Sequence, residues 1–206
     1  MEGMVSQYII LLLNNIIYSN KLIRFNFYFL LFASTILLAS DESNNQRELA
    51  IHHFMQGEFL LNQGNYALAV LEFQDALDID PNASTIHISI ADAYRRLGRS
   101  KHAENHLRIA IDLDPTDLSS REMLGHLYLI NRKYDMAEKE FLVLSNLDNS
   151  NDNYITILGD LAKMQERWIQ SVEYYLNANK INPQNFKALE NALQVCLGAE
   201  LWEKAE

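Results

Sequence analysis

Residues Gly64 to Pro81 read GNYALAVLEFQDALDIDP, and the fold can be inferred from these residues because the chain repeats their pattern. A glycine and an aromatic residue come first, two alanines flank a phenylalanine in the middle, and a proline comes last. Thirty-four residues later, Gly98 to Pro115 reads GRSKHAENHLRIAIDLDP, with alanines and a leucine in the matching places. The pattern returns over residues 132–149 and 166–183. A fixed period of this size indicates stacked supersecondary units.

The composition favours helices and argues against nucleic-acid binding. The chain has 206 residues, 49% of them apolar, with only 7 glycines and 3 prolines, which disfavours disorder and turn-rich β structure. Without Glu2, Lys21 and Arg24, residues 41–206 hold 15 basic and 26 acidic residues, a net charge of −11. Such a surface repels phosphate backbones, so we expect no nucleic-acid partner. The single cysteine, Cys196, excludes an internal disulfide and is expected to be a packing residue.

Strong helix formers recur at helical spacing, so the sequence predicts an all-α fold of short helices joined by turns. Each pair of helices is expected to turn at Gly64, Gly98, Arg132 or Glu166. Pro81, Pro115 and Pro183 end second helices, because an interior proline costs about 3 kcal/mol, and Asn149 takes this role in the third unit. The predicted helices are 46–63 with 66–79, 84–97 with 100–113, 118–131 with 134–147, 152–165 with 168–180, and 186–199.

Residues 1–40 lie outside the repeat and have the pattern of a targeting segment. Lys21 and Arg24 precede the apolar run from Phe25 to Ala39, an order typical of a secretory signal. As a helix this run spans about 22 Å, less than the roughly 30 Å hydrocarbon core, which favours a signal over a permanent anchor. The long apolar start and the poor cleavage site leave an uncleaved membrane anchor open, and a buried helix packed on the repeats is a third alternative. A signal or an anchor would export the repeats, because the positive charges stay on the cytoplasmic side.

Residues 41–49 are expected to link this segment to the repeats. DESNN, from Asp41 to Asn45, reads as a polar linker. Asn45 with Glu48 three residues later predicts an N-cap and its reciprocal partner, so a helix should begin near Gln46.

The repeated positions resemble those of the tetratricopeptide repeat (TPR) family over residues 50–206. Small residues stand midway along the first helices and early in the second helices, and large residues follow four positions later. These three sets are Gly57, Ala91, Gly125 and Gly159; Ala69, Ala103, Ala137, Ser171 and Ala205; and Phe73, Leu107, Phe141 and Tyr175. Small residues let two helices approach closely, and large ones fill the space beside the crossing.

This resemblance implies a right-handed solenoid of antiparallel helix pairs, with four full repeats and a partial fifth. The repeats are expected at residues 50–83, 84–117, 118–151, 152–185 and 186–206. The chain departs from the family at Ser100 and Leu144, where an aromatic residue and an alanine are usual. It also has His53, His87, Arg121, Ile155 and Leu189 where the family often has tryptophan.

Catalytic and metal-binding patterns are largely missing from the sequence. His102 and His106 lie four apart, but the intervening sequence does not match the zinc-protease motif, and an exposed polar helix face is the favoured interpretation. His87 and His126 lie on first helices, where they could contact a peptide. We therefore expect a protein that is not an enzyme and needs no metal or cofactor.

The family resemblance places a binding groove on the first helices, which usually takes an extended peptide or a partner helix. The candidate groove residues are Phe54, Glu58, Thr85, Ile88, Asp92, Arg95, Arg96, Glu122, His126, Leu129, Thr156, Asp160 and Lys163. The positions at which some members grip a terminal carboxylate hold Phe54, Glu58, Ser89, Ser119 and Met123, which cannot neutralise one. Arg95 and Arg96 form a basic pair that would favour an acidic ligand.

The resulting hypothesis is a non-catalytic adaptor that scaffolds a cell-envelope complex by binding a protein or peptide segment, with membrane contact only through residues 1–40. The alternative is the recognition region of a larger enzyme or sensor whose catalytic domain lies beyond Glu206. A self-assembling array is a third hypothesis. Trp202 and Ala205 lie at the start of the second helix of the fifth repeat, and only about one turn of that helix is present. One turn cannot cover the first helix of the repeat. We therefore expect the reading frame to continue, or a partner or second copy to cover this end.

Overall fold

The computed structural model describes residue 42 and residues 44–198 of the chain. The chain divides into two compact units, residues 1–49 and residues 50–206. The expected signal or anchor over residues 1–40 lies outside the described residues, as do Trp202 and Ala205 of the partial fifth repeat.

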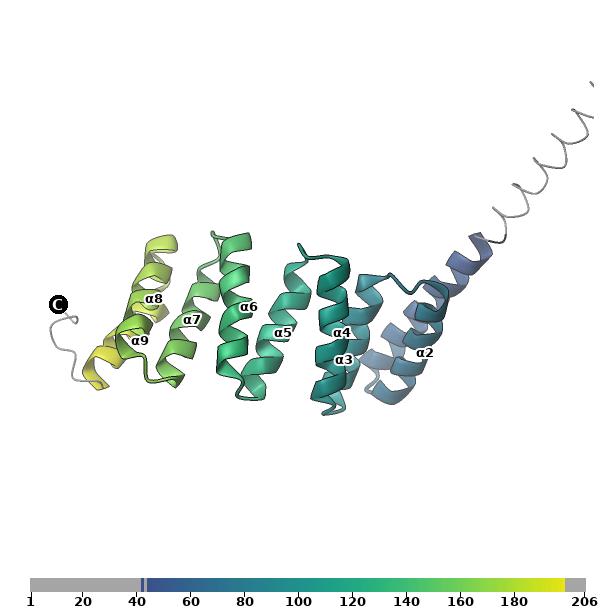
Figure 1. Ribbon diagram of the computed structural model, residues 1–206, viewed down its shortest axis with the longest axis horizontal. Helices are drawn as coiled ribbons and strands as arrows, with labels where there is room; N and C mark the ends of the chain where they lie inside the picture. Colours follow the sequence, from purple (N-terminus) through teal and green to yellow (C-terminus); the bar gives the residue numbers. More distant parts are fainter. Residues whose placement is uncertain (1–41, 43, 199–206) are drawn as a thin grey trace, which may run out of the picture. The chain divides into compact units, whose positions relative to one another are not determined.

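The second unit is a row of antiparallel helices in which α2 to α9 each pack on the next (Figure 1). Its first helix covers residues 50–62. The following helices are α2 (Tyr66–Ile79), α3 (Ser84–Arg96), α4 (Ser100–Leu113), α5 (Leu118–Ile130), α6 (Tyr134–Leu147), α7 (Asp152–Met164), α8 (Trp168–Ile181) and α9 (Phe186–Gly198). No strand occurs in the described part of the chain. The all-α prediction is confirmed, and the predicted bounds of α2 to α9 agree to within one residue.

The predicted N-cap at Asn45 is wrong. Asn44 and Asn45 are already helical, and so is Glu42. The segment has no proline or glycine to stop a helix, and each residue added to an existing helix gains a backbone hydrogen bond. Extension of the helix toward the N-terminus is therefore more favourable than an end at the capping pattern of Asn45 and Glu48.

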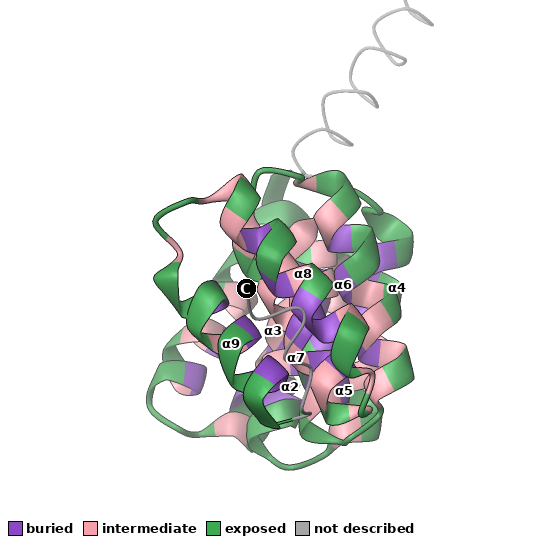
Figure 2. Ribbon diagram, turned by 90° about the vertical axis from the view of Figure 1, so that its left-hand side faces the viewer, coloured by how far each residue is buried: buried purple, intermediate pink, exposed green. Residues whose placement is uncertain are grey.

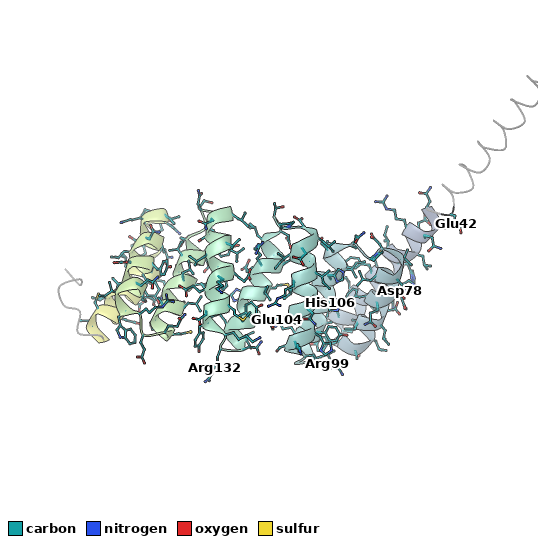
Figure 3. All side chains as sticks on the ribbon, viewed as in Figure 1. Glu42, Asp78, Arg99, Glu104, His106 and Arg132 are labelled. Atoms are coloured by element: carbon teal, nitrogen blue, oxygen red, sulfur yellow. The ribbon has the colours of Figure 1, made fainter. Side chains whose placement is uncertain are left out.

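The turn inside each helix pair has the same backbone geometry in four repeats. Gly64 and Gly98 have φ values of 83° and 72°, and Arg132 and Glu166 have 56° and 59° (Arg132 is labelled in Figure 3). In each turn the next N–H donates to the carbonyl five residues back, as from Asn65 to Leu60 at 2.9 Å. This 6→1 bond with a left-handed residue is the Schellman ending of a helix. The predicted turn positions are confirmed, but two non-glycine residues occupy a conformation that favours glycine.

The turns between repeats are held by a side chain instead. Asp114 Oδ1 accepts a hydrogen bond from the backbone N–H of Thr116 at 3.0 Å, and Asp148 Oδ1 accepts one from Ser150 at 3.2 Å. Asp80 and Asn182 make the equivalent bonds in the first and fourth repeats. These side chains stabilise the turn directly. Asn149 can therefore replace proline, because Asp148 still fixes the turn.

The helix crossings match small residues to large ones. A Cβ atom added at Gly125 would lie 2.8 Å from Cε2 of Phe141, and one at Gly159 would lie 2.6 Å from Cε1 of Tyr175. Such distances leave no room for a methyl group, so these glycines are required by the rings. In the second repeat Ala91 is tolerated opposite the smaller Leu107, and both are buried. The crossing prediction is confirmed.

Buried side chains form two clusters. In Figure 2 the buried positions lie mainly on the inner faces of the helices and the exposed positions on the outside. One cluster extends from the first helix to α7, and the other joins α8 to α9. Cys196 is 1% exposed in the second cluster, which confirms its packing role. Among the described helices, none is both long and apolar enough to cross a membrane.

Candidate binding groove

A hollow of about 670 Å³ lies between the first helices of three successive repeats, namely residues 50–62, α3 and α5. Its apolar lining consists of Leu61, Ile88, Met123, Leu129 and Ile130. Its polar lining consists of Glu58, Ser89, Asp92, Arg95 and His126. An apolar floor with a few polar groups is the usual composition of a ligand site.

Six candidate groove residues line this hollow: Glu58, Ile88, Asp92, Arg95, His126 and Leu129. Sequence reasoning omitted Leu61 and Ile130, although Leu61 lies one helical turn after Glu58 and Ile130 one turn after His126. Ser89 and Met123 also line the hollow, although the sequence indicates only that they cannot grip a terminal carboxylate. They lie 34 residues apart, so they occupy one position in successive repeats.

Four of the five polar residues of the hollow are hydrogen-bonded in pairs, Ser89 with Glu58 and Arg95 with Asp92. The Ser89 hydroxyl donates to Oε1 of Glu58 at 2.5 Å, which joins α3 to the preceding helix. This bond orients the Glu58 carboxylate but does not cancel its charge, because a hydroxyl is a neutral donor. The bond also shows why Ser89 cannot serve a ligand carboxylate.

Arg95 and Arg96 are paired with Asp92 rather than presented together to a ligand. Arg95 Nη2 lies 2.5 Å from Asp92 Oδ1, and Arg96 Nε lies 2.7 Å from Asp92 Oδ2. Arg96 also lies over the ring of Tyr66, 5.6 Å from its centroid, and it does not line the hollow. The hydrogen bond from Arg96 to Asp92 raises the pKa of the guanidinium. One carboxylate thus contacts both guanidinium groups, which leaves a net charge of +1, and the expected preference for an acidic ligand stays a prediction.

Two candidate residues on α5 and α7 are engaged by tyrosines. Tyr154 donates its hydroxyl to Glu122 at 3.4 Å, and Tyr175 donates to Asp160 at 2.6 Å. Burial and the neighbouring Asp160 raise the pKa of Tyr175, so this hydroxyl stays a donor. These hydrogen bonds fix the two carboxylates against neighbouring helices. Neither Glu122 nor Asp160 lines the hollow.

The remaining candidates also lie outside the hollow. The Phe54 ring packs on the core, with its centroid 5.9 Å from that of Phe73. Thr156 donates its hydroxyl to the backbone carbonyl of Asp152 at 2.9 Å. Thr85 is exposed in the first turn of α3, and Lys163 is half-buried near the end of α7.

The structure corrects the interpretation of His87 and His106. His106, on α4 (Figure 3), is half-buried and lies with its Nδ1 3.0 Å from Nδ1 of His87. His87 is only 6% exposed, so it cannot contact a peptide in this structure. Burial lowers the pKa of both rings, to about 4 for His106, where the charge of His87 adds to the effect. The pair is a neutral contact between helices, not an exposed face.

One group of three metal-ligating side chains occurs in the described part of the chain. It consists of His53, Glu72 and Asp75, whose ligand atoms all lie within 4.8 Å of one another. His53 Nδ1 lies 2.8 Å from Glu72 Oε2 and 4.0 Å from Asp75 Oδ2. None of the three lines the hollow.

Comparisons with known proteins agree with this architecture. Two family models described as tetratricopeptide repeat match residues 37–84 and 84–117. DnaJ homolog subfamily C member 3 of Bos taurus is 29% identical over 155 residues, which are 73% of this chain and 30% of that protein. A protein O-mannosyl-transferase of Caenorhabditis elegans is 33% identical over 91 residues, 44% of this chain. The chain thus spans only 13% to 30% of the length of these relatives.

Solved structures share the same arrangement of helices. The structure of MamA matches with a TM-score of 0.68 at 18% identity, over 77% of this chain and 86% of that one. YrrB, described as a TPR protein with an unusual peptide-binding site, matches with a TM-score of 0.64 at 17% identity, over 82% of this chain and 86% of that one. At these identities the likeness shows the fold alone. The two matched repeat models, together with the period of 34 residues, place the chain in the tetratricopeptide repeat family.

Proposed function

We propose that this protein is an interaction scaffold that binds an extended segment of a partner protein in the hollow formed by the helix of residues 50–62, α3 and α5. The observation that carries the proposal is the apolar floor of Ile88, Met123 and Leu129, supplied by two successive first helices. Side chains that lie on separate repeats but share one hollow suit a chain that runs across them. The peptide-binding site attributed to YrrB supports the same use of this fold.

Site-specific crosslinking tests this proposal. A photo-crosslinking amino acid at His126, whose side chain is 48% exposed in the hollow, should capture a partner segment in native cells. The same probe at the exposed Asp112 on α4, outside this hollow, is the matched control. Replacement of Met123 by arginine should abolish capture at His126, because a charge would be buried beneath the partner. Equal capture at both probe positions, or none at His126, would contradict a groove function.

We further propose that the repeats work outside the cytoplasm, in a complex of the cell envelope. The support is the order of Lys21 and Arg24 before the apolar run from Phe25 to Ala39. A reporter enzyme that is active only after export should be active when fused after Asn45. Activity only with a cytoplasmic reporter would contradict export. A mature N-terminus near Ser40 would show that the segment is a cleaved signal rather than an anchor.

A second candidate is the recognition region of a larger enzyme. The similarity to a protein O-mannosyl-transferase over 91 residues supports this alternative. The coding sequence downstream of Glu206 distinguishes the two: a catalytic domain there favours the enzyme, and a stop codon favours the separate scaffold.

A further inference from the structure

One inter-helix contact recurs in the first three repeats and differs in chemistry each time. His53 bonds Glu72 in the first repeat, His87 bonds His106 in the second, and Arg121 bonds Glu140 in the third. In each pair the residues are 19 positions apart, and successive pairs are shifted by 34. Ile155 and Tyr174 occupy the position in the fourth repeat as partly buried apolar residues. Two side chains are enough for this contact, because the ion pair of Arg121 and Glu140 joins the two helices of the third repeat.

The first repeat has a third group at this contact. Asp75 Oδ2 lies 4.0 Å from the same His53 Nδ1 that bonds Glu72. At the position of Asp75 the next three repeats carry Ile109, Val143 and Asn177, so the pair does not depend on a second carboxylate. The first repeat alone therefore joins one imidazole and two carboxylates at this contact.

The two carboxylates also lack a compensating cation. Among the described residues, neither Glu72 nor Asp75 has a lysine or arginine within ion-pair distance. Glu140, the equivalent of Glu72, is paired with Arg121 at 3.1 Å. The two carboxylates together carry a charge of −2, which a divalent cation bound between them and the imidazole nitrogen would cancel.

We propose that His53, Glu72 and Asp75 bind a divalent transition-metal ion, with Zn²⁺ as the representative. An imidazole nitrogen and carboxylate oxygens are ligands that zinc accepts at about 2.0–2.2 Å. The three atoms already lie within 4.8 Å, so side-chain rotation on two packed helices can bring them to one ion. Side-chain exposures of 25%, 30% and 60% leave an open side for water or a further ligand. The ion would cross-link the helix of residues 50–62 to α2.

The experiment is a zinc titration of the full chain after treatment with a chelator. Calorimetry measures binding, and thermal unfolding measures the midpoint with and without zinc. We expect one zinc ion per chain and a higher midpoint with zinc. Asp75→Asn keeps the His53–Glu72 bond but removes one direct ligand, and should weaken binding by more than the loss of about tenfold caused by removing an outer-shell partner. His53→Gln should abolish binding at this position.

Two control variants separate this site from other histidines. His126→Gln removes a histidine that lies 3.8 Å from Glu122 without a third ligand, and it should leave zinc binding unchanged. His102→Gln tests the i, i+4 pair on α4 in the same way. Absence of saturable zinc binding would overturn the proposal. So would wild-type affinity in Asp75→Asn and His53→Gln, or a loss of binding confined to the control variants.

Discussion

At the scale of single residues, the size of one side chain sets the size of its partner at each helix crossing. Gly125 and Gly159 face aromatic rings, whereas Ala91 faces Leu107. A methyl group on glycine needs the space that the ring occupies. Small and large residues are therefore coupled in pairs, and a change in one should depend on the other.

This coupling gives a first prediction. Gly125→Ala should lower the free energy of unfolding by about 1–3 kcal/mol, because the new Cβ would lie 2.8 Å from Phe141. Phe141→Leu alone should also destabilise, by leaving a cavity. The double variant reproduces the Ala91–Leu107 pair. Its loss of unfolding free energy should be smaller than the sum of the losses in the two single variants. Urea unfolding of all four proteins measures the coupling, and strict additivity would contradict the match.

The His87–His106 contact gives a second prediction, on pH. Burial holds the pKa of His106 at about 4 in the folded chain, below the ordinary value of 6.5, and lowers that of His87 in the same direction. Between those values the unfolded chain binds more protons, so stability should fall as the pH drops from 7 to 5. After allowance for the partial exposure of His106, we expect a loss on the order of 1 kcal/mol.

The control for this pH effect is a histidine elsewhere in the chain. His106→Gln should flatten the dependence of the urea midpoint on pH between 7 and 5. His126→Gln, at an exposed position on α5, should leave the slope as it is in the wild type. An unchanged slope in His106→Gln would mean that other groups cause the effect.

At the scale of elements, the turns inside the helix pairs share one geometry but not one residue type. Gly64 and Gly98 adopt positive φ without steric cost, whereas Arg132 and Glu166 adopt it against the preference of their Cβ atoms. The third and fourth repeats therefore carry a small local strain that the surrounding helices hold in place.

The third prediction follows from this difference. Arg132→Gly should raise the free energy of unfolding by up to about 1 kcal/mol, because relief of the left-handed strain exceeds the added freedom of the unfolded chain. Gly98→Arg should lower it by a similar amount. The urea midpoints report both changes, provided that the slope of unfolding with urea stays constant. Destabilisation by Arg132→Gly would show that the arginine side chain matters more than its backbone.

At the scale of the whole repeat unit, described helices contact their neighbours along the chain, and the buried residues fall into two clusters. The stability of such a stack is approximately a sum of repeat and interface terms. A local defect should therefore loosen nearby helices first. Destabilisation of α9 should therefore leave the helices that line the hollow, in the first three repeats, as stable as before.

Hydrogen exchange tests this fourth prediction. Gly159→Ala places a Cβ 2.6 Å from Tyr175 and should speed amide exchange in α7, α8 and α9 more than in α3 and α4. Gly57→Ala is the matched change near the other end, 2.5 Å from Phe73, and should have the reverse distribution. A uniform rise in exchange across all helices in either variant would mean that the stack unfolds as one unit.

The repeat period, the bounds of α2 to α9, the turn positions and the crossing residues can be predicted from the amino-acid sequence alone. These features follow from local backbone preferences and from spacing, and four copies in register reinforce one another. The failed cap at Asn45 marks the limit, since a local signal yields where the helix can simply continue.

The partners of the polar side chains, in contrast, can be seen only in the folded chain. The sequence could place Arg95 and Arg96 beside the groove, but not show that Asp92 holds both. It could place His87 on a first helix, but not show that His106 covers it from 19 residues away. Polar groups take whichever partner the folded helices bring within hydrogen-bond distance, so their roles depend on geometry and burial rather than on spacing alone.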